Sequence, residues 1–513
     1  MMITKQENLK EKPPLYWLII FWVLALHVIG SFNVFAEQGS EFTEGTSEYI
    51  LKFSNEEPSK VLIEAHMRVS KGQIRMASWG HPWLQHGWAT FVKNLVATDS
   101  SGNEVAASLV EKDGWGAWEL PVNEGEVVSL SYEVILEHVN YDWNKSGGQD
   151  SRPEWKGGAL FAVSKAFFIY SGLDKQSIVK FVLPNSWDLS TPWSEFGSNT
   201  STFKVSSWES LISNMFVIGK YKKYATAYDK MNLVLALDES LEEYAETIHE
   251  TLQAQLKTYD KIFDGVPDVN FLIGIRSANE DDGEAFHNSF NQVMELETLA
   301  NSDARFIWGN TLGHEMLHFW IGTYTLKSND KSNMYWFMEG FTEYYSSLTT
   351  YQNDLISQEN YLKRLENYLA RYFITSNMWP EERVSLKSAG ESKHKNWLRI
   401  YGGGATIALA LDIDIHIKSQ GKQSLDDLMR LLKMKYGGTG SYISNDKVLE
   451  ALNELTGRSY DNFFKEYILT PDGYLDIEPF LSSVGIQALS RVDEFFLTVK
   501  DSEKYQAFIN RTP

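Results

Sequence analysis

The 513-residue chain contains no cysteine. It can therefore form no disulfide bond, and no thiolate is available as a metal ligand or as a nucleophile. Histidine is scarce as well, with 11 residues, so a metal site would have to combine a few His side chains with Asp or Glu. Lys and Arg number 47 against 68 Asp and Glu, which gives a net charge of −21. Because such an acidic surface repels phosphate backbones, we expect no nucleic-acid partner.

Long apolar runs are also rare, and the one that resembles a membrane segment lies near the N-terminus. Lysines precede the run from Leu15 to Ile29, and small residues follow it up to Ala36. This order is typical of a secretory signal peptide over residues 1–36. The alternative is an uncleaved anchor, because residues 14–35 reach the ~20 residues that span a bilayer. Either interpretation predicts an exported protein, periplasmic or extracellular, that meets the membrane only through this segment.

Between residues 47 and 224 the sequence consists of short runs in which apolar and polar residues alternate. Examples are the runs at 49–53, 60–65 and 127–134. Turn clusters such as Ser101-Gly102-Asn103 separate the runs. The pattern predicts an all-β N-terminal domain, which we assign to residues 37–224. The histidines of this region are scattered and have no catalytic spacing.

Helical spacing replaces this alternation after Asp238. Apolar residues recur at helical intervals up to Phe263, and Asp264-Gly265 ends the predicted helix. A strand candidate follows at residues 270–275. Beyond Thr311 the patterns are mostly helical.

One of the later helices begins at residues 424–427 with a sequence typical of a capping box. The expected fold class is therefore α+β, with an all-β domain followed by a mainly helical domain. We assign the second domain to residues 225–480 and a C-terminal extension to residues 481–513.

The strongest chemical signal is the sequence His314-Glu315-Met316-Leu317-His318. Residues four apart lie on one face of a helix, so both imidazoles can point at one metal ion. Glu315 can then lie beside an open coordination position and take a proton from a water molecule. The flanking residues are apolar, as expected of a buried helix. Because five residues can match by chance, the motif needs support from elsewhere in the chain.

That support comes from Glu339, which follows His318 within a second predicted helix. Two His and one Glu leave a fourth tetrahedral position open, as catalytic zinc requires. We therefore predict zinc on these residues, although the spacing alone is also compatible with Co or Mn. Glu343 is four residues past Glu339, on the same helical face. It is a candidate to hold the free ring nitrogen of a ligand His, with His314 as the expected partner.

Hydrolysis also requires a group that stabilises the oxyanion. The sequence offers Tyr401, followed by three glycines at the start of an apolar helix. On physical grounds alone Tyr401 is one candidate among 25 tyrosines, and a glycine-rich helix start usually serves backbone packing.

Together these motifs resemble those of the gluzincin metallopeptidases. The resemblance rests on the helix motif, on the segment Glu-Gly-Phe-Thr-Glu-Tyr-Tyr at residues 339–345, and on the Tyr-x-x-Gly that begins at Tyr401. Within this group the chain is similar to the glycyl aminopeptidase family. The resemblance implies a thermolysin-like catalytic domain and one Zn²⁺ held by the two His and Glu339. It also implies that Glu315 is the base and that Tyr401 stabilises the tetrahedral intermediate.

The chain departs from the family pattern in three places. Related aminopeptidases bind the free amine of the substrate with a Glu at the position occupied here by Phe286, which leaves Glu284 and Glu280 as candidates for that contact. The basic stretch expected after the zinc helix is missing, and the linker to Glu339 is short. After Gly473 only 40 residues remain, too few for the PDZ domain that family members often carry.

The sequence thus predicts an exported, zinc-dependent peptidase that acts on peptide substrates. By resemblance, the first expectation is an aminopeptidase that removes small N-terminal residues. An endopeptidase or oligopeptidase is the alternative, because Phe286 replaces the expected Glu. A further alternative is that the protein is not an enzyme but a non-catalytic binding module with a relic zinc site. The sequence carries no prediction of the oligomeric state.

Overall fold

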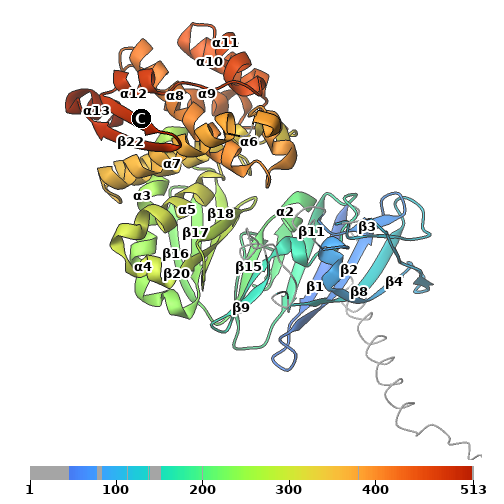
Figure 1. The fold of residues 1–513 in the computed structure, drawn as a ribbon. Coiled ribbons are helices and arrows are strands. Elements are labelled where there is room, and N and C mark those ends of the chain that lie inside the picture. Colours follow the sequence, from blue (N-terminus) through green and yellow to red (C-terminus); the bar gives the residue numbers. More distant parts are fainter. Residues whose placement is uncertain are drawn as a thin grey trace, which may run out of the picture. The chain divides into compact units, whose positions relative to one another are not determined.

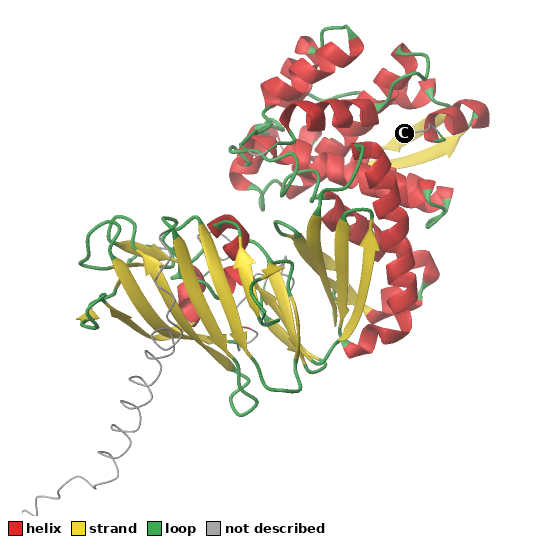
Figure 2. Ribbon diagram, turned by 180° about the vertical axis from the view of Figure 1, so that it is seen from behind, coloured by secondary structure: helices red, strands yellow, loops and turns green. Residues whose placement is uncertain are grey.

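A computed structural model describes residues 45–510, except 78–83, 113, 137, 139–151, 199, 379 and 439. The predicted signal peptide or anchor at residues 1–36, and with it the predicted export, lies outside the described residues. The described residues from Ser47 onward form one compact unit. Helices dominate the C-terminal part of this unit and strands its N-terminal part (Figure 2). The expected fold class is therefore confirmed.

The N-terminal region contains an eight-stranded sheet with the strand order β13-β14-β11-β1-β2-β8-β4-β5. Its strands are β1 (Thr46–Lys52), β2 (Lys60–Arg68), β4 (Val92–Thr98), β5 (Glu104–Val105), β8 (Val127–Ile135), β11 (Gln176–Val182), β13 (Ser194–Glu195) and β14 (Thr202–Val205). The three runs predicted from alternation correspond to β1, β2 and β8. In β8 every second residue is buried, because successive side chains of a strand point to opposite faces.

Two smaller sheets complete the N-terminal region. One has the order β12-β15-β10-β9 and the other the order β3-β7-β6. Their strands are β3 (Gln73–Arg75), β6 (Ser108–Leu109), β7 (Ala117–Glu119), β9 (Glu154–Lys156), β10 (Ala159–Val163), β12 (Asp188–Ser190) and β15 (Met215–Gly219), and helix α2 (Trp208–Ile212) precedes β15. All residues of β10 and β15 are buried. Aromatic side chains fill much of the core between these strands, which accounts for part of the high aromatic content.

A five-stranded sheet follows, with the order β16-β17-β18-β20-β19. Its strands are β16 (Lys222–Tyr228), β17 (Met231–Leu237), β18 (Val269–Ala278), β19 (Asp282–Ala285) and β20 (Ser289–Glu295). The three central strands are parallel, whereas both edge strands are antiparallel. Strand β16 spans the predicted boundary at residue 224 and pairs with β17, so it belongs to this sheet.

Helices α3 (Ala245–Phe263), α4 (Leu296–Ala300) and α5 (Arg305–Leu317) lie along this sheet (Figure 1). The helix predicted after Asp238 begins as a 3-10 segment, with the Asp238 side chain accepting a hydrogen bond from Ser240. Helix α3 ends at Asp264, which adopts a left-handed conformation with φ of 51°. The sheet also packs against β15 of the N-terminal region, where Gly274 leaves room for the Met215 side chain.

In its described residues, the C-terminal region is helical apart from one hairpin. It comprises α6 (Tyr335–Gln352), α7 (Gln358–Asn377), the π-helical turn η9 (Arg399–Gly403), α8 (Gly404–Lys418), α9 (Leu425–Tyr436), α10 (Asn445–Thr456), α11 (Asp461–Phe464), the π-helical turn η10 (Lys465–Leu469), α12 (Glu478–Ser483), the strands β21 (Ile486–Arg491) and β22 (Glu494–Val499), and α13 (Ser502–Ile509). The predicted capping box of α9 is confirmed, with Ser424 and Asp427 capping each other's backbone.

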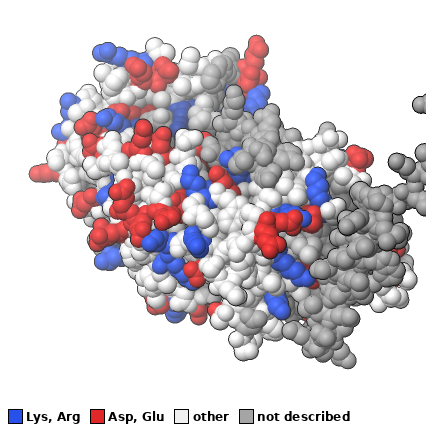
Figure 3. Space-filling view, turned by 90° about the horizontal axis from the view of Figure 1, so that it is seen from below, with Lys and Arg blue, Asp and Glu red and all other residues white. Residues whose placement is uncertain are grey.

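The β21–β22 hairpin packs onto this helical region. The Leu497 backbone of β22 donates a hydrogen bond to Glu366 on α7, over 2.7 Å. Within the described residues, one helical stretch, Arg399–Lys418, has the length and composition of a membrane span, and 78% of its apolar window is buried inside the protein. On the face shown in Figure 3, acidic side chains form several groups with basic side chains between them.

Candidate active site

Helix α5 presents two imidazoles on one face. The His314 and His318 rings lie 4.6 Å apart, edge to face. The helix ends at Leu317, so His318 is its C-cap residue. The Nδ1 atom of His318 lies 3.0 Å from the carbonyl oxygen of Ile321, and a hydrogen bond donated there leaves Nε2 with a free lone pair. The turn after α5 therefore orients the second imidazole as a metal ligand.

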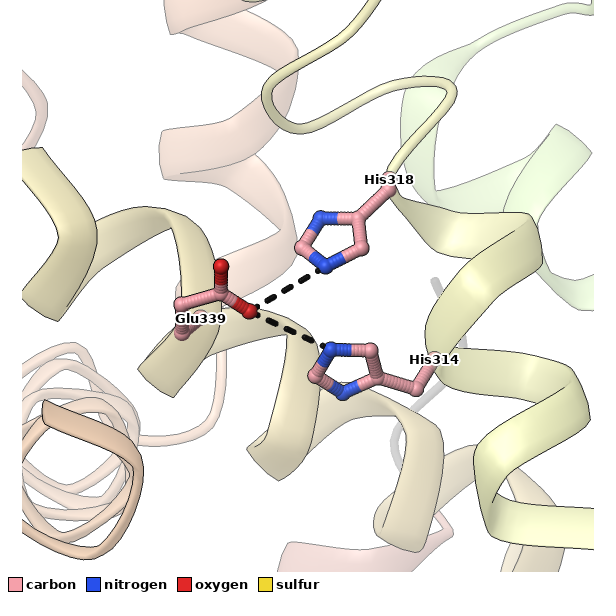
Figure 4. A group of neighbouring side chains, drawn as sticks. All are labelled: His314, His318 and Glu339. Carbon is pink, nitrogen blue, oxygen red and sulfur yellow. Dashed lines mark ion pairs between the residues drawn. The ribbon is translucent and has the colours of Figure 1, made fainter. Parts of the chain in front are cut away.

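Glu339 on α6 completes a three-residue group. Its Oε2 lies 3.3 Å from the Nε2 of His314 and 3.2 Å from the Nε2 of His318 (Figure 4). This oxygen is buried and, among the described residues, has no hydrogen-bond donor. A buried carboxylate oxygen without a donor is costly, and a cation bound between the three ligand atoms, which lie within 4.8 Å of one another, would satisfy it. The three predicted ligands are thus brought together in a geometry that can hold a metal.

Lys393 occupies the other side of the Glu339 carboxylate, a neighbour that sequence reasoning missed. Its Nζ donates a hydrogen bond to Oε1 of Glu339 over 2.7 Å. Burial alone would raise the pKa of Glu339, but Lys393 and the two imidazoles lower this pKa well below its ordinary value. The carboxylate is therefore ionised, with Oε1 engaged and Oε2 directed at the imidazoles. Nothing in the sequence around Lys393 marks it as a partner of a residue 54 positions earlier.

The candidate base, Glu315, is buried on α5 against the edge strand β19. A Cβ atom at Gly283 would lie 2.6 Å from the Cγ of Glu315, so a side chain at this strand position would push the Glu315 side chain aside. Glu315 also interacts electrostatically with Tyr401. The base, the three candidate ligands and the tyrosine therefore share one site.

Tyr401 reaches this site from the π-helical turn η9 rather than from the start of an ordinary helix. Its ring stacks 5.9 Å from the ring of His314, with an angle of 13° between the planes. Burial, followed by the nearby Glu339 carboxylate, raises the pKa of Tyr401 well above its ordinary value. The phenol therefore keeps its proton at neutral pH and can donate a hydrogen bond.

The three glycines after Tyr401 allow this turn to approach two other helices. A Cβ at Gly340, next to Glu339, would lie 2.3 Å from the Cα of Gly404. A Cβ at Gly402 would lie 2.4 Å from the Cβ of Arg371 on α7. The glycines therefore bring the backbone that carries Tyr401 close to the helix that carries the candidate ligand Glu339.

Replacing Gly340 by Ala tests this close approach. Alanine favours a helix by about 1 kcal/mol over glycine, but its Cβ would collide with the Gly404 backbone. We expect the collision to prevail and to lower the free energy of unfolding by about 1–3 kcal/mol, with a parallel loss of activity. Gly438→Ala is the matched control, because nothing lies within 4 Å of its Cβ position. Equal unfolding midpoints for the two variants would show that the contact is not required.

Glu343 lies one helical turn beyond Glu339 and binds several donors. Its Oε2 accepts hydrogen bonds from Arg364 over 3.1 Å, from Tyr368 over 2.7 Å and from Asn310 over 3.3 Å. Burial alone would raise its pKa, but Arg364 and His314 lower the pKa to about 2. Glu343 thus lies within electrostatic range of His314 and is itself held in place. A direct hydrogen bond between the two stays a prediction.

The two candidates for the substrate amine are placed differently. Glu284 on β19 forms an ion pair with Lys165 of the N-terminal region, with Nζ–Oε distances of 2.5 and 2.7 Å. Lys165 is almost fully buried and also lies over the Phe286 ring. Glu280 lies in the turn before β19. The Glu284 carboxylate is therefore already neutralised by a lysine 119 positions earlier in the chain, a pairing that no sequence pattern indicates.

The comparisons with known proteins agree with this site. The model of the M61 glycyl aminopeptidase family matches residues 308–406, the segment from α5 to Tyr401 and the start of α8. A comparison with curated proteins finds no match. Among solved structures, an aminopeptidase N family protein from Idiomarina loihiensis matches with a TM-score of 0.73 and 17% identity, over 87% of this chain and 79% of that chain.

At this level of identity the structural likeness establishes the fold. The family match covers the segment that contains all the predicted ligands, the candidate base and the candidate tyrosine. The two findings together support a peptidase. The chain therefore resembles the M61 glycyl aminopeptidases in the segment that carries the candidate site, on a fold similar to that of an aminopeptidase N family protein.

Proposed function

We propose that this protein is a zinc-dependent peptidase with its active site at His314, His318 and Glu339. The observation that carries the proposal is the buried Oε2 of Glu339, which lies between two imidazole nitrogens and accepts no hydrogen bond from any residue that the structure describes. Two imidazoles and one carboxylate are the donor set of catalytic zinc sites that keep a position open. Bound there, zinc would polarise the scissile carbonyl and make a water molecule more acidic.

The side chains of this chain supply the proton transfers. Glu315 takes a proton from the attacking water and later gives it to the leaving amine. Glu315 follows His314 on α5, and Gly283 of β19 approaches its side chain closely enough to leave no room for a Cβ. Tyr401, whose phenol remains protonated, donates a hydrogen bond to the oxyanion that develops on the carbonyl.

Two kinds of peptidase, which differ in their substrate preference, are compatible with this function. The family resemblance favours an aminopeptidase that removes small N-terminal residues. The ion pair between Glu284 and Lys165 favours the second candidate, an oligopeptidase or endopeptidase, because Glu284 is not free to bind a substrate amine. Glu280 is the one predicted amine-binding carboxylate for which the described structure records no such ion pair.

The test combines metal analysis with cleavage of paired peptides. We expect about one zinc ion per purified chain, and hydrolysis that is lost on chelation and restored by added zinc. Because Glu284 is paired, we expect N-acetylated peptides to be cleaved with kcat/KM within about tenfold of their free counterparts, since a lost charged hydrogen bond would cost more. Cleavage confined to free N-termini, and abolished in Glu280→Gln, would support the aminopeptidase instead. If the purified protein held no metal and showed no activity in excess zinc, the proposal would be wrong. The non-catalytic binding module would then be the remaining interpretation.

A further inference from the structure

Arg371 on α7 lies near the site and forms no ion pair within 4 Å among the described residues, although Glu343 acts on it electrostatically. Its stem packs against the backbone at Gly402, directly after Tyr401. About two helical turns earlier, Arg364 forms an ion pair with Glu343 over 3.1 Å. Within the part of the chain that the structure describes, Arg371 forms no such ion pair, and its recorded contact is with the ring of Trp397, 5.0 Å from the guanidinium carbon to the ring centroid.

Trp397 links Arg371 to the candidate active site. Its ring lies 6.4 Å from the ring of Tyr401, which in turn lies 5.9 Å from the ring of His314. Trp397 is 45% exposed, whereas His314 is buried. Arg371, Trp397, Tyr401 and His314 thus form a continuous row that runs from solvent to the candidate metal ligands.

An arginine in this position has a free capacity for hydrogen bonds. Burial lowers the pKa of Arg371, with Glu343 acting in the opposite direction, yet a guanidinium stays charged in proteins. A guanidinium that lies over an aromatic face keeps its N–H edge available for a planar, two-pronged partner. Carboxylates fit this edge with two parallel hydrogen bonds.

The neighbouring charges point to the same class of ligand. Two of the carboxylates near the site are already paired, Glu339 with Lys393 and Glu343 with Arg364. Lys331 lies within electrostatic range of Glu339 and Lys393 and adds a further positive charge. Although the whole chain carries a net charge of −21, the cations Lys331, Arg364, Arg371 and Lys393 lie around the candidate site.

We propose that Arg371, supported by Trp397, binds a carboxylate of the peptide substrate, either the C-terminal carboxylate or an acidic side chain near the scissile bond. This inference rests on the proposed peptidase function and adds a preference for one substrate class. Arg371 acts in it as a specificity-determining residue and takes no part in the proton transfers.

The test compares kcat/KM for matched peptides in wild type, Arg371→Met and Arg371→Lys. One pair differs in a free or amidated C-terminus, and the other in Glu or Gln beside the scissile bond. We expect wild type to favour the carboxylate member of one pair by roughly 10- to 100-fold, the effect of a charged hydrogen bond. Arg371→Met should reduce this ratio to about threefold or less. Arg371→Lys should give an intermediate ratio, because lysine supplies charge without the planar fork.

Lys363→Met is the matched control on the same helix, because Lys363 is exposed and pairs with Glu359. It should keep the wild-type ratio in both pairs. The pair that shows the preference identifies the source of the carboxylate. A wild-type ratio near one in both pairs, or an unchanged ratio in both Arg371 variants, would overturn the inference.

The same experiment separates this inference from the proposed function. Hydrolysis of the amidated and Gln peptides reports on the peptidase activity alone, whatever the ratio. If no peptide is hydrolysed, the proposed function fails. Calorimetric binding of the same pairs to wild type and Arg371→Met then still decides whether Arg371 recognises a carboxylate, since equal affinities would refute it.

Discussion

Replacing Glu315 by Gln should lower kcat by about 10²- to 10⁴-fold while the protein keeps its zinc. The amide has nearly the same shape as the carboxylate, so the contact with Gly283 and the packing of α5 should survive. It cannot take a proton from water, so the attack on the carbonyl loses its base. The candidate ligands His314 and His318 on the same helix are unchanged. Activity with saturating substrate and zinc content by metal analysis would be measured on the same preparation.

A matched control is Glu359→Gln, which removes an exposed carboxylate that pairs with Lys363 on α7. This variant should retain wild-type kcat and zinc. If Glu315→Gln loses zinc together with activity, the side chain supports the metal site rather than the proton transfer. If it keeps more than about a tenth of wild-type kcat, another group is the base.

Replacing Glu339 by Gln should remove zinc from the purified protein and lower kcat/KM by at least about 10³-fold. The neutral amide is a poor ligand, and the ammonium of Lys393, 2.7 Å from Oε1 in the native site, would lose its counter-charge. The uncompensated lysine then repels a cation from the two imidazoles. Zinc affinity would be measured by competition with a chelator, and activity would be followed as zinc is added back.

Glu343→Gln is the informative comparison, because Glu343 lies one turn away from Glu339 on the same helix. If Glu343 orients His314 from behind, its loss should weaken zinc binding by roughly 10- to 100-fold, far less than the loss of a ligand. Equal effects of the two substitutions would contradict the assignment of Glu339 as the ligand. An unchanged zinc affinity in Glu343→Gln would limit Glu343 to its structural contacts with Arg364 and Tyr368.

Some elements could be predicted because their signals are local. Alternation identified β1, β2 and β8, and helical spacing identified α3 together with its end at Asp264. The capping box at Ser424 was likewise readable, because its two hydrogen bonds join residues three positions apart. Side-chain periodicity and capping depend on neighbours within one or two turns. The π-helical turn at Tyr401 was not predicted. Its geometry accompanies close contacts with α6 and α7, which lie earlier in the sequence and are not visible in the residues of the turn itself.

The sequence by itself determined which groups could perform chemistry. With no cysteine and few histidines, a metal site had to use His and carboxylates, and the four-residue spacing of His314 and His318 identified one. Only the tertiary structure decided which charges surround that site. Lys393 meets Glu339 across 54 residues, Lys165 meets Glu284 across 119, and Arg371 packs against the turn of Tyr401. Such contacts depend on how helices and sheets pack, and no local pattern of residues encodes them.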